Sequence, residues 1–133
     1  MQDLSKPGRK LPAPIPAPES AEFWKAAAEG KFLIKRCTAC SKPHWYPRAI
    51  CPFCMSPKTE WIEATGRGKI YSYSTMRRAP VPFSLAYVTL EEGPTMMTNL
   101  VQCDFDQLSI GQAVKITFVP TEGGPPVPCF TLA

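Results

Sequence analysis

Four of the six cysteines in this chain form two Cys-x2-Cys pairs, which is a metal-binding pattern. Cys37 and Cys40 form the first pair, and Cys51 and Cys54 follow after ten intervening residues. Each Cys-x2-Cys turn points two sulfurs at one spot, and a hairpin that joins two such turns supplies four thiolates in a tetrahedron. The spacing predicts one structural zinc ion in a small zinc ribbon, with no coordination position left for a substrate.

Two alternatives to a zinc site use the same cysteines. A bare iron centre of rubredoxin type has similar ligands, and the sequence does not distinguish the two metals. Redox-active or free cysteine pairs are the second alternative, but in a reducing compartment paired Cys-x2-Cys motifs more often hold metal. His44 is the single histidine. With four cysteines present, we expect it to be a surface or packing residue rather than a ligand or a base.

The other two cysteines, Cys103 and Cys129, are the candidates for an independent catalytic site. A nucleophilic cysteine needs a base or a positive field beside it, and His44 lies in another module. Cys103 shares a strand face with Val101, which favours a buried packing role. The chain has no paired carboxylates at a catalytic spacing, no Gly-rich phosphate loop and no nucleophile elbow. We therefore expect no catalytic site in this chain alone.

The elements that position these residues begin with a proline-rich arm at 1–18, for which we expect an extended polyproline II conformation. A helix is predicted over 19–29, with Pro18 and Ser20 as start signals and Gly30 as the C-cap. Phe23 and Trp24 lie on this helix. A partner-docking role is favoured for them over packing on the chain's own core, because the preceding arm offers little to cover two large aromatic rings.

The rest of the chain is predicted to form short strands. Residues 31–62 contain the ribbon, and five strands follow at 70–76, 85–90, 96–101, 114–118 and 130–132. A helical turn is expected within 104–111, and Tyr71 and Tyr73 are expected on one face of the first strand. Five strands with a break between the third and fourth match an OB-type barrel. The predicted fold is mainly β, with a helix plus rubredoxin-like zinc ribbon at 19–62 and a five-stranded OB-fold domain at 63–133.

Composition and charge narrow the class of protein. The chain is 44% hydrophobic, and none of its apolar runs approaches the roughly 18 residues that cross a bilayer. The first residues lack the apolar segment of a signal peptide, so we expect a soluble cytoplasmic protein without membrane attachment. Residues 1–78 have a net charge of +8 and residues 79–133 one of −4. The basic half fits an anionic partner, such as a nucleotide-bearing cofactor or nucleic acid, and solvated surface charge explains it equally well.

Three segments together resemble a known family. They are FWKAAAEGKFLIKRCTAC, YPRAICPFC and WIEATGRGKIYSYSTM, at residues 23–40, 46–54 and 61–76. Their order is similar to that of zinc-ribbon plus OB-fold proteins associated with acyl-CoA enzymes, long labelled a domain of unknown function. The likeness runs from about residue 19 to about residue 118. Its most specific features are the helix before the ribbon, the aromatic-Pro-Arg triplet at 46–48 and the Gly-x-Gly-x-Ile-Tyr sequence at 66–71.

The resemblance implies an accessory role in a hetero-oligomer. Similar proteins accompany thiolase-type or ketosynthase-like subunits in complexes for acyl transfer, thiolytic cleavage or retro-aldol cleavage of CoA thioesters. The partner in such complexes supplies the nucleophilic cysteine and the histidines. By this analogy the four paired cysteines are zinc ligands and an acyl-CoA is the substrate of the complex. Thiolysis or acyl transfer is favoured over aldol cleavage, whereas the particular acyl-CoA and the stoichiometry stay open.

A role in CoA binding has candidate residues in four basic side chains that flank the first barrel strand: Arg67, Lys69, Arg77 and Arg78. Their charges suit either the phosphates of CoA or salt bridges to the partner, and the sequence favours neither.

Binding of single-stranded nucleic acid is the alternative function. Zinc ribbons and OB-folds both occur in nucleic-acid-binding proteins, and Tyr71 and Tyr73 could stack on bases. The acidic second half argues against this alternative, because strands two to five of the barrel have almost no basic residues.

Overall fold

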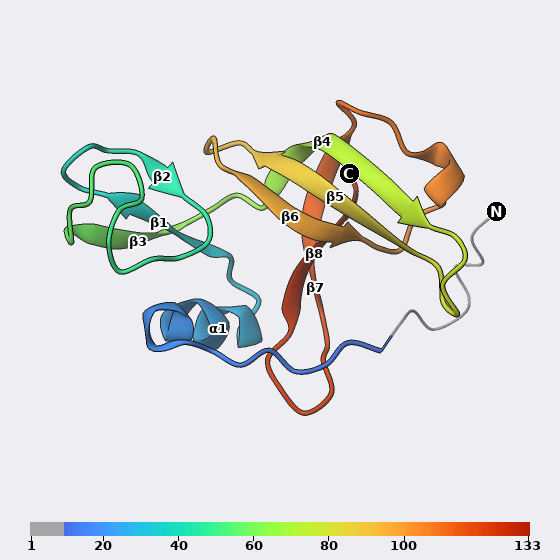
Figure 1. The fold of residues 1–133 in the computed structure, drawn as a ribbon, viewed down its shortest axis with the longest axis horizontal. Coiled ribbons are helices and arrows are strands. Elements are labelled where there is room, and N and C mark those ends of the chain that lie inside the picture. Colours follow the sequence, from blue (N-terminus) through green and yellow to red (C-terminus); the bar gives the residue numbers. More distant parts are fainter. Residues whose placement is uncertain (1–9) are drawn as a thin grey trace.

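The computed structural model describes residues 10–133, which fold into two small sheets with one α-helix beside them (Figure 1). The first half has η1 (Pro18–Ser20), α1 (Ala21–Ala28), β1 (Leu33–Cys37), β2 (Pro43–His44) and β3 (Thr59–Glu63). The second half has β4 (Arg67–Met76), β5 (Phe83–Leu90), β6 (Thr95–Leu100), η2 (Phe105–Gln107), β7 (Ala113–Val119) and β8 (Val127–Leu132). Within residues 10–133, no helix has the length and apolar character required to cross a bilayer.

The five strands of the second half close into a barrel in the order β4-β5-β6-β8-β7, and β4 pairs with β7 to complete the ring. All neighbours are antiparallel except β6 and β8. This is the arrangement of an OB-fold, with η2 in the predicted break between the third and fourth strands. The first half forms the antiparallel sheet β2-β1-β3 of the ribbon. The mainly β fold predicted from the sequence is confirmed.

The helix predicted over 19–29 is shorter in the structure, because its first residues form the 3-10 turn η1. The Ser20 hydroxyl and the Ala17 backbone exchange hydrogen bonds across this turn. At the end of the helix, Gly30 adopts a φ of +79°, which is open to glycine without a Cβ penalty. The Gly30 N–H bonds to the Ala27 carbonyl and the Lys31 N–H to the Ala26 carbonyl, which is a Schellman cap.

The expected docking role of the helix is wrong for its central ring, because Phe23 is fully buried in the chain's own core. Its ring centroid lies 5.0 Å from that of Trp45 and 6.3 Å from that of Phe32. Trp24 is half-buried and donates its indole N–H to the Tyr46 hydroxyl at 3.1 Å. The cover for both rings comes from the ribbon, more than twenty residues later, rather than from the preceding arm.

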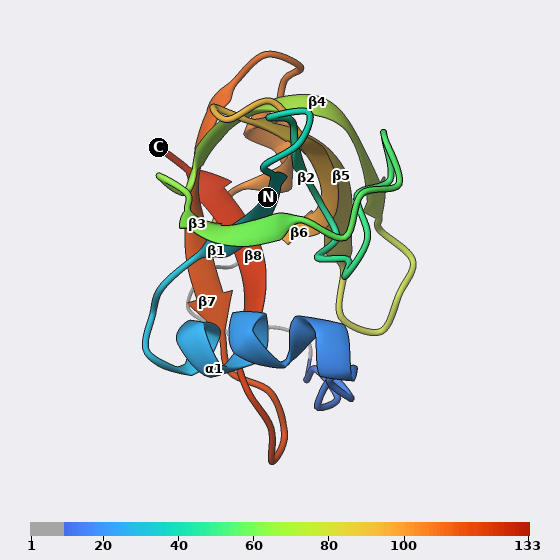
Figure 2. The ribbon, with the colours of Figure 1, turned by 90° about the vertical axis from the view of Figure 1, so that its left-hand side faces the viewer.

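One core joins the helix, the ribbon and the barrel. Phe32 precedes β1 and lies 6.5 Å, centroid to centroid, from Phe130 of β8. Both belong to the same buried cluster as Phe23 and Ile34 of the ribbon side and Val88 of the barrel. Figures 1 and 2 show α1 lying below the ribbon sheet in both views. Burial of each large aromatic side chain contributes about 2–3 kcal/mol, so this shared cluster fixes the ribbon against the barrel.

The tyrosines of β4 do not share a face, contrary to the expectation. Ile70 pairs with Val88 and Ser72 with Tyr87, so Tyr71 is an extra residue in a β-bulge. A bulge shifts the alternation by one residue. Tyr71 therefore lies outside, whereas Tyr73 pairs with the buried Ala86 and donates its hydroxyl to the Leu108 carbonyl at 2.9 Å.

The glycines at the entrance to the barrel are required by close packing. Gly66 has a φ of +78°, and a Cβ there would lie 2.4 Å from Cγ2 of Ile116. A Cβ on Gly68 would lie 2.6 Å from the Thr89 carbonyl oxygen. This explains the Gly-x-Gly spacing, because Gly66 just before β4 and Gly68 within β4 both lie too close to neighbouring strands for a side chain.

The described part of the arm, residues 10–17, lies against the loop between β7 and β8. Pro12 forms an isolated parallel bridge with Glu122, and the Glu122 N–H donates to the Leu11 carbonyl at 3.0 Å. Ile15 is almost fully exposed. Residues 1–9, the other part of the predicted arm, lie outside the described residues.

Replacement of Gly66 by alanine should destabilise the chain more than replacement of Gly30. The two glycines have nearly the same positive φ, which costs alanine about 1 kcal/mol at each position. A Cβ at Gly30 meets no atom within 4 Å. At Gly66 the clash with Ile116 should add about 1–3 kcal/mol. Urea denaturation of both variants measures this difference, and equal losses would contradict the close packing.

Candidate metal centre

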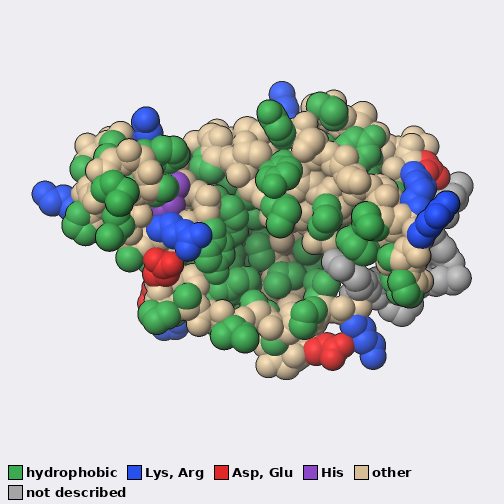
Figure 3. Space-filling view, in the orientation of Figure 1, with side chains coloured by type: hydrophobic (Ala, Val, Ile, Leu, Met, Phe, Trp, Pro, Cys, Tyr) green, Lys and Arg blue, Asp and Glu red, His purple; other side chains and the backbone are tan. Residues whose placement is uncertain are grey.

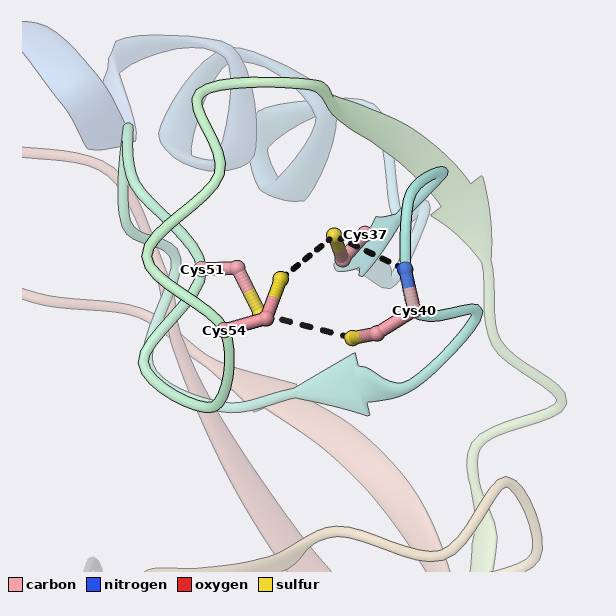
Figure 4. Close-up of side chains that lie close together, drawn as sticks. All are labelled: Cys37, Cys40, Cys51 and Cys54. Atoms are coloured by element: carbon pink, nitrogen blue, oxygen red, sulfur yellow. Dashed lines mark hydrogen bonds between the residues drawn. The ribbon is translucent and has the colours of Figure 1, made fainter.

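The four paired cysteines converge on one point, as the sequence predicted (Figure 4). Their sulfur atoms all lie within 4.8 Å of one another. Sγ of Cys37 is 3.5 Å from that of Cys54, and Sγ of Cys40 is 3.7 Å from that of Cys51. A disulfide would require about 2.05 Å, so these separations exclude one. Four thiolates about 2.3 Å from a central metal would be about 3.8 Å apart, so the cluster fits a tetrahedral ion.

Two equivalent backbone turns bring the sulfurs together. The Ser41 N–H bonds to the Cys37 carbonyl and the Met55 N–H to the Cys51 carbonyl, both at 2.9 Å. Ser41 and Met55 each adopt a left-handed conformation, with φ of 64° and 66°. Such values are uncommon for residues other than glycine. Their presence at the same place in both turns shows that the two Cys-x2-Cys segments are held in one repeated geometry.

The pKa values of the clustered thiols also indicate a site for a cation. The Cys40 backbone N–H donates to Sγ of Cys37 at 3.4 Å and is the main reason that the pKa of the Cys37 thiol falls to about 7. At Cys54 the Ser56 backbone lowers the thiol pKa, but the neighbouring thiols, Cys37 first, and burial outweigh it and raise this pKa to about 12. Four thiols this close cannot all ionise without a positive ion among them.

The aromatic-Pro-Arg triplet attaches the metal-bearing loop to the helix. Tyr46 accepts the Trp24 indole hydrogen bond, and Pro47 is fully buried. Arg48 forms an ion pair with Glu19 at 3.4 Å, and the Ala49 N–H donates to the other carboxylate oxygen of Glu19 at 2.9 Å. The bond from Ala49, more than the charge of Arg48, lowers the pKa of Glu19. The triplet is therefore a structural connection between the ribbon and the start of the helix.

The remaining candidates for chemistry are buried. His44 lies on β2, and burial, together with the positive charges of Lys35 and Arg48, lowers its pKa. It is a packing histidine that stays neutral at physiological pH. Cys103 and Cys129 are also buried, and burial raises the pKa of the Cys103 thiol. None of these three side chains is exposed to a substrate.

The four basic residues predicted to flank the first barrel strand do not form one cluster. Arg67 and Arg77 are ten residues apart along β4, which corresponds to roughly 30 Å of extended chain. Each has an acidic partner within the chain: Arg67 pairs with Glu91 at 3.1 Å and Arg77 with Asp106 at 2.7 Å. Within residues 10–133, neither Lys69 nor Arg78 forms an ion pair.

A groove that no sequence pattern indicated lies between the ribbon and the barrel. Its volume is about 370 Å³. Figure 3 shows the hollow near the middle of the molecule, with hydrophobic side chains at its floor. Four segments line it: Leu11 and Pro12, Trp45 and Tyr46, Met96 to Asn99, and Val127 to Cys129. This groove was not predicted, because its walls come from segments that are far apart along the chain.

Replacement of Cys51 by serine should remove the metal and unfold the ribbon together. Binding energy at such a site is folding energy of about 10–16 kcal/mol, which is comparable to the about 5–15 kcal/mol that stabilises a typical domain. Metal analysis and circular dichroism measure the two effects. Cys103→Ser is the control, because it alters a buried cysteine outside the cluster and should keep the metal. A Cys51→Ser protein with full stability and no metal would contradict a structural site.

Two family models match the chain, one for each unit. The model described as ChsH2, rubredoxin-like zinc ribbon domain, matches residues 24–60. The model described as ChsH2, C-terminal OB-fold domain, matches residues 61–119. The two descriptions agree with the ribbon sheet and the closed barrel of the structure.

Individual relatives agree with this assignment. A DUF35 domain-containing scaffold protein of Methanocaldococcus jannaschii is 35% identical over 104 residues, which are 71% of this chain and 73% of that protein. A probable enoyl-CoA hydratase alpha subunit of Thermomonospora curvata is 31% identical over 134 positions. The match covers 97% of this chain but only 42% of that longer protein. The solved structure of the Ltp2-ChsH2(DUF35) aldolase has a TM-score of 0.79 and 31% identity, with 90% of this chain and 98% of that chain covered. The chain belongs to the DUF35 family, whose members combine a rubredoxin-like zinc ribbon with an OB-fold domain.

Proposed function

We propose that this chain is a non-catalytic, zinc-binding accessory subunit of a hetero-oligomeric, thiolase-like enzyme that acts on acyl-CoA thioesters. The observation that carries the proposal is the cluster of four cysteine sulfurs within 4.8 Å of one another. Every exposed or half-buried cysteine in residues 10–133 belongs to this cluster and is a potential metal ligand. A metal ion bound by all four thiolates would have no coordination position left for a substrate, and this is the one such cluster in residues 10–133.

Zinc is the metal we assign to this centre. A set of four thiolates suits either zinc or iron, and the zinc ribbon family model supports zinc. Cys37, Cys40, Cys51 and Cys54 would hold the ion, which would contribute folding energy and no reaction step. Metal analysis of the purified protein separates the two metals, as does its visible spectrum, because zinc has a filled d shell and no visible bands.

The absence of a second reactive site supports an accessory role. Within residues 10–133, Cys103 and Cys129 are buried, and the single histidine is buried on β2 and has a lowered pKa. A thiol nucleophile needs exposure and a lowered pKa, whereas burial and the neighbouring Asp104 raise that of Cys103. The nucleophile and the base of the proposed reaction therefore belong to the partner.

The names of relatives support a partner protein. One relative is called an alpha subunit, others are called scaffold proteins, and the similar solved structure is titled an aldolase of two named components. These names do not include a thiolase, and the thiolase-like partner rests on the family resemblance. The word aldolase in that title supports carbon–carbon bond cleavage as a possible reaction of the complex. The sequence had favoured thiolysis or acyl transfer.

A direct contribution to CoA binding is a separate part of the proposal. Lys69 and Arg78 are the two candidate cations that form no ion pair in residues 10–133, whereas Arg67 and Arg77 already bind Glu91 and Asp106. Because the two ends of β4 are far apart, one CoA molecule on this chain would contact one end only. The same two cations also suit acidic residues of the partner.

Binding of nucleic acid gains no support from the geometry. The β-bulge separates Tyr71 from Tyr73, so the expected pair of stacking rings is absent from the outer face of β4. A filter-binding assay with a salt titration tests this alternative.

Co-expression with the thiolase-like protein of the same operon or pathway tests the proposed function. Size-exclusion chromatography should give one complex, and acyl-CoA cleavage should require both chains, because the partner supplies the reactive groups. Assays with and without added CoA separate thiolysis from retro-aldol cleavage, since only thiolysis consumes CoA. Independent elution, with the partner fully active alone, would contradict the accessory role.

A further inference from the structure

We propose that the catalytic partner docks on the outer surface of β4, β5 and β6 together with the adjoining groove. We call this surface the docking face, and it consists of Tyr71, Leu85, Tyr87, Met97 and the groove residues Trp45 and Tyr46. The partner surface that fits it is a protein surface with an apolar centre and carboxylates at its edge. This inference rests on the proposed function and identifies where the partner binds.

The outer surface of the barrel presents large apolar side chains in adjacent rows. The strand register places Ser72, Tyr87 and Met97 side by side, and Leu85 lies in the next row beside Ser74 and Asn99. Tyr71 is 66% exposed, Met97 60% and Tyr87 48%. Figure 3 shows hydrophobic side chains gathered over these strands. A contiguous group of exposed aromatic and methionine side chains is typical of protein interfaces.

The groove continues this surface toward the ribbon. Met97 lines the 370 Å³ groove and also a smaller hollow of about 240 Å³ between β4 and β5. No charged side chain lines either of them. The two hollows and the exposed rows therefore form one apolar surface, which includes the rings of Trp45 and Tyr46. A partner side chain buried in the groove would be an anchor of the kind that dominates interface energies.

The groove exists because the barrel is weakly closed at this seam. In residues 10–133, β6 and β8 share a single register pair, Leu100 with Phe130. Pro128 has no backbone N–H to donate to β6, so the ladder cannot continue past it. Four consecutive residues of β6, Met96 to Asn99, line the groove, as expected for a strand seen from its edge. Thr98 of β6 bridges the seam through its hydroxyl, which donates to the Pro128 carbonyl at 3.0 Å. A partner in the groove would therefore meet β6 mainly through side chains such as that of Met97.

The charges around the docking face determine the class of partner. Lys69 lies on the outer face of β4 two residues before Tyr71, and Arg78 follows the other end of that strand. Both are exposed, and neither forms an ion pair within residues 10–133. Two copies of this chain joined through the face would bring these like charges together, whereas a partner with acidic edge residues would pair them. A nucleic acid would need cations along the face, and its centre has none.

Substitution of Met97 by lysine tests the docking face, with Met55→Lys as the matched control. Met55 is 72% exposed at the tip of the second metal-binding turn, so both changes add the same charge at an exposed methionine. Affinity for the thiolase-like partner is measured by calorimetry with zinc-loaded full-length chains of unchanged circular dichroism. Met97→Lys should weaken binding at least 30-fold, because the partner's apolar centre would face an unpaired charge. Met55→Lys should leave affinity within twofold.

A second pair of variants tests the edge charges. Lys69→Glu with Arg78→Glu should slow association about tenfold at low salt and reduce its salt dependence.

The wild-type chain and the partner must form a complex for the proposed function to hold, and no complex at all would overturn both proposals. A wild-type complex that Met97→Lys leaves intact would overturn the docking face alone. Self-association or oligonucleotide binding that is lost with Met97→Lys would also overturn it, by identifying a different occupant.

Discussion

The mutual repulsion of four closely placed thiolates is the constraint on which the rest of this structure depends. Sulfurs within 4.8 Å of one another need a cation to be stable as thiolates. With that cation, the two Cys-x2-Cys turns are fixed relative to each other, and so is the loop between them. That loop carries Trp45, which covers Phe23, and Tyr46, whose hydroxyl accepts the Trp24 hydrogen bond. A bound metal ion would thus affect the helix as well as the ribbon, through side-chain packing.

The aromatic cluster carries the same constraint into the barrel. Phe32 lies between the ribbon and Phe130 of β8, so the ribbon and the barrel share one core rather than being linked only by chain. This shared core holds one wall of the groove, Trp45 and Tyr46, opposite the other, Met96 and Met97. If the proposed accessory role is right, this groove between two units would offer the partner a surface of defined shape. We therefore infer that the metal site, through the shared core, determines the shape of the docking face.

The sequence predicted what local chemistry determines. Cysteine spacing predicted the cluster, Gly30 predicted the helix end, and strand patterns with one break predicted the OB-fold. The failures concern contacts between distant segments. The docking role predicted for Phe23 was wrong because Trp45, the residue that packs over its ring, lies twenty-two residues later in the sequence. The β-bulge at Tyr71 was not predicted, because an extra residue in a strand leaves the composition of that strand unchanged. The groove was not predicted either, because its walls also come from segments that are far apart along the chain.

The claim that most needs testing is that this chain activates a partner and performs no chemistry itself. The direct measurement is a titration of the purified zinc-loaded chain into catalytic partner prepared without it, with acyl-CoA cleavage as the readout. We predict that the partner alone is nearly inactive, that activity rises to a plateau at a fixed ratio of the two chains, and that chelator-treated chain restores none. A partner whose activity is unchanged at every ratio would contradict the account.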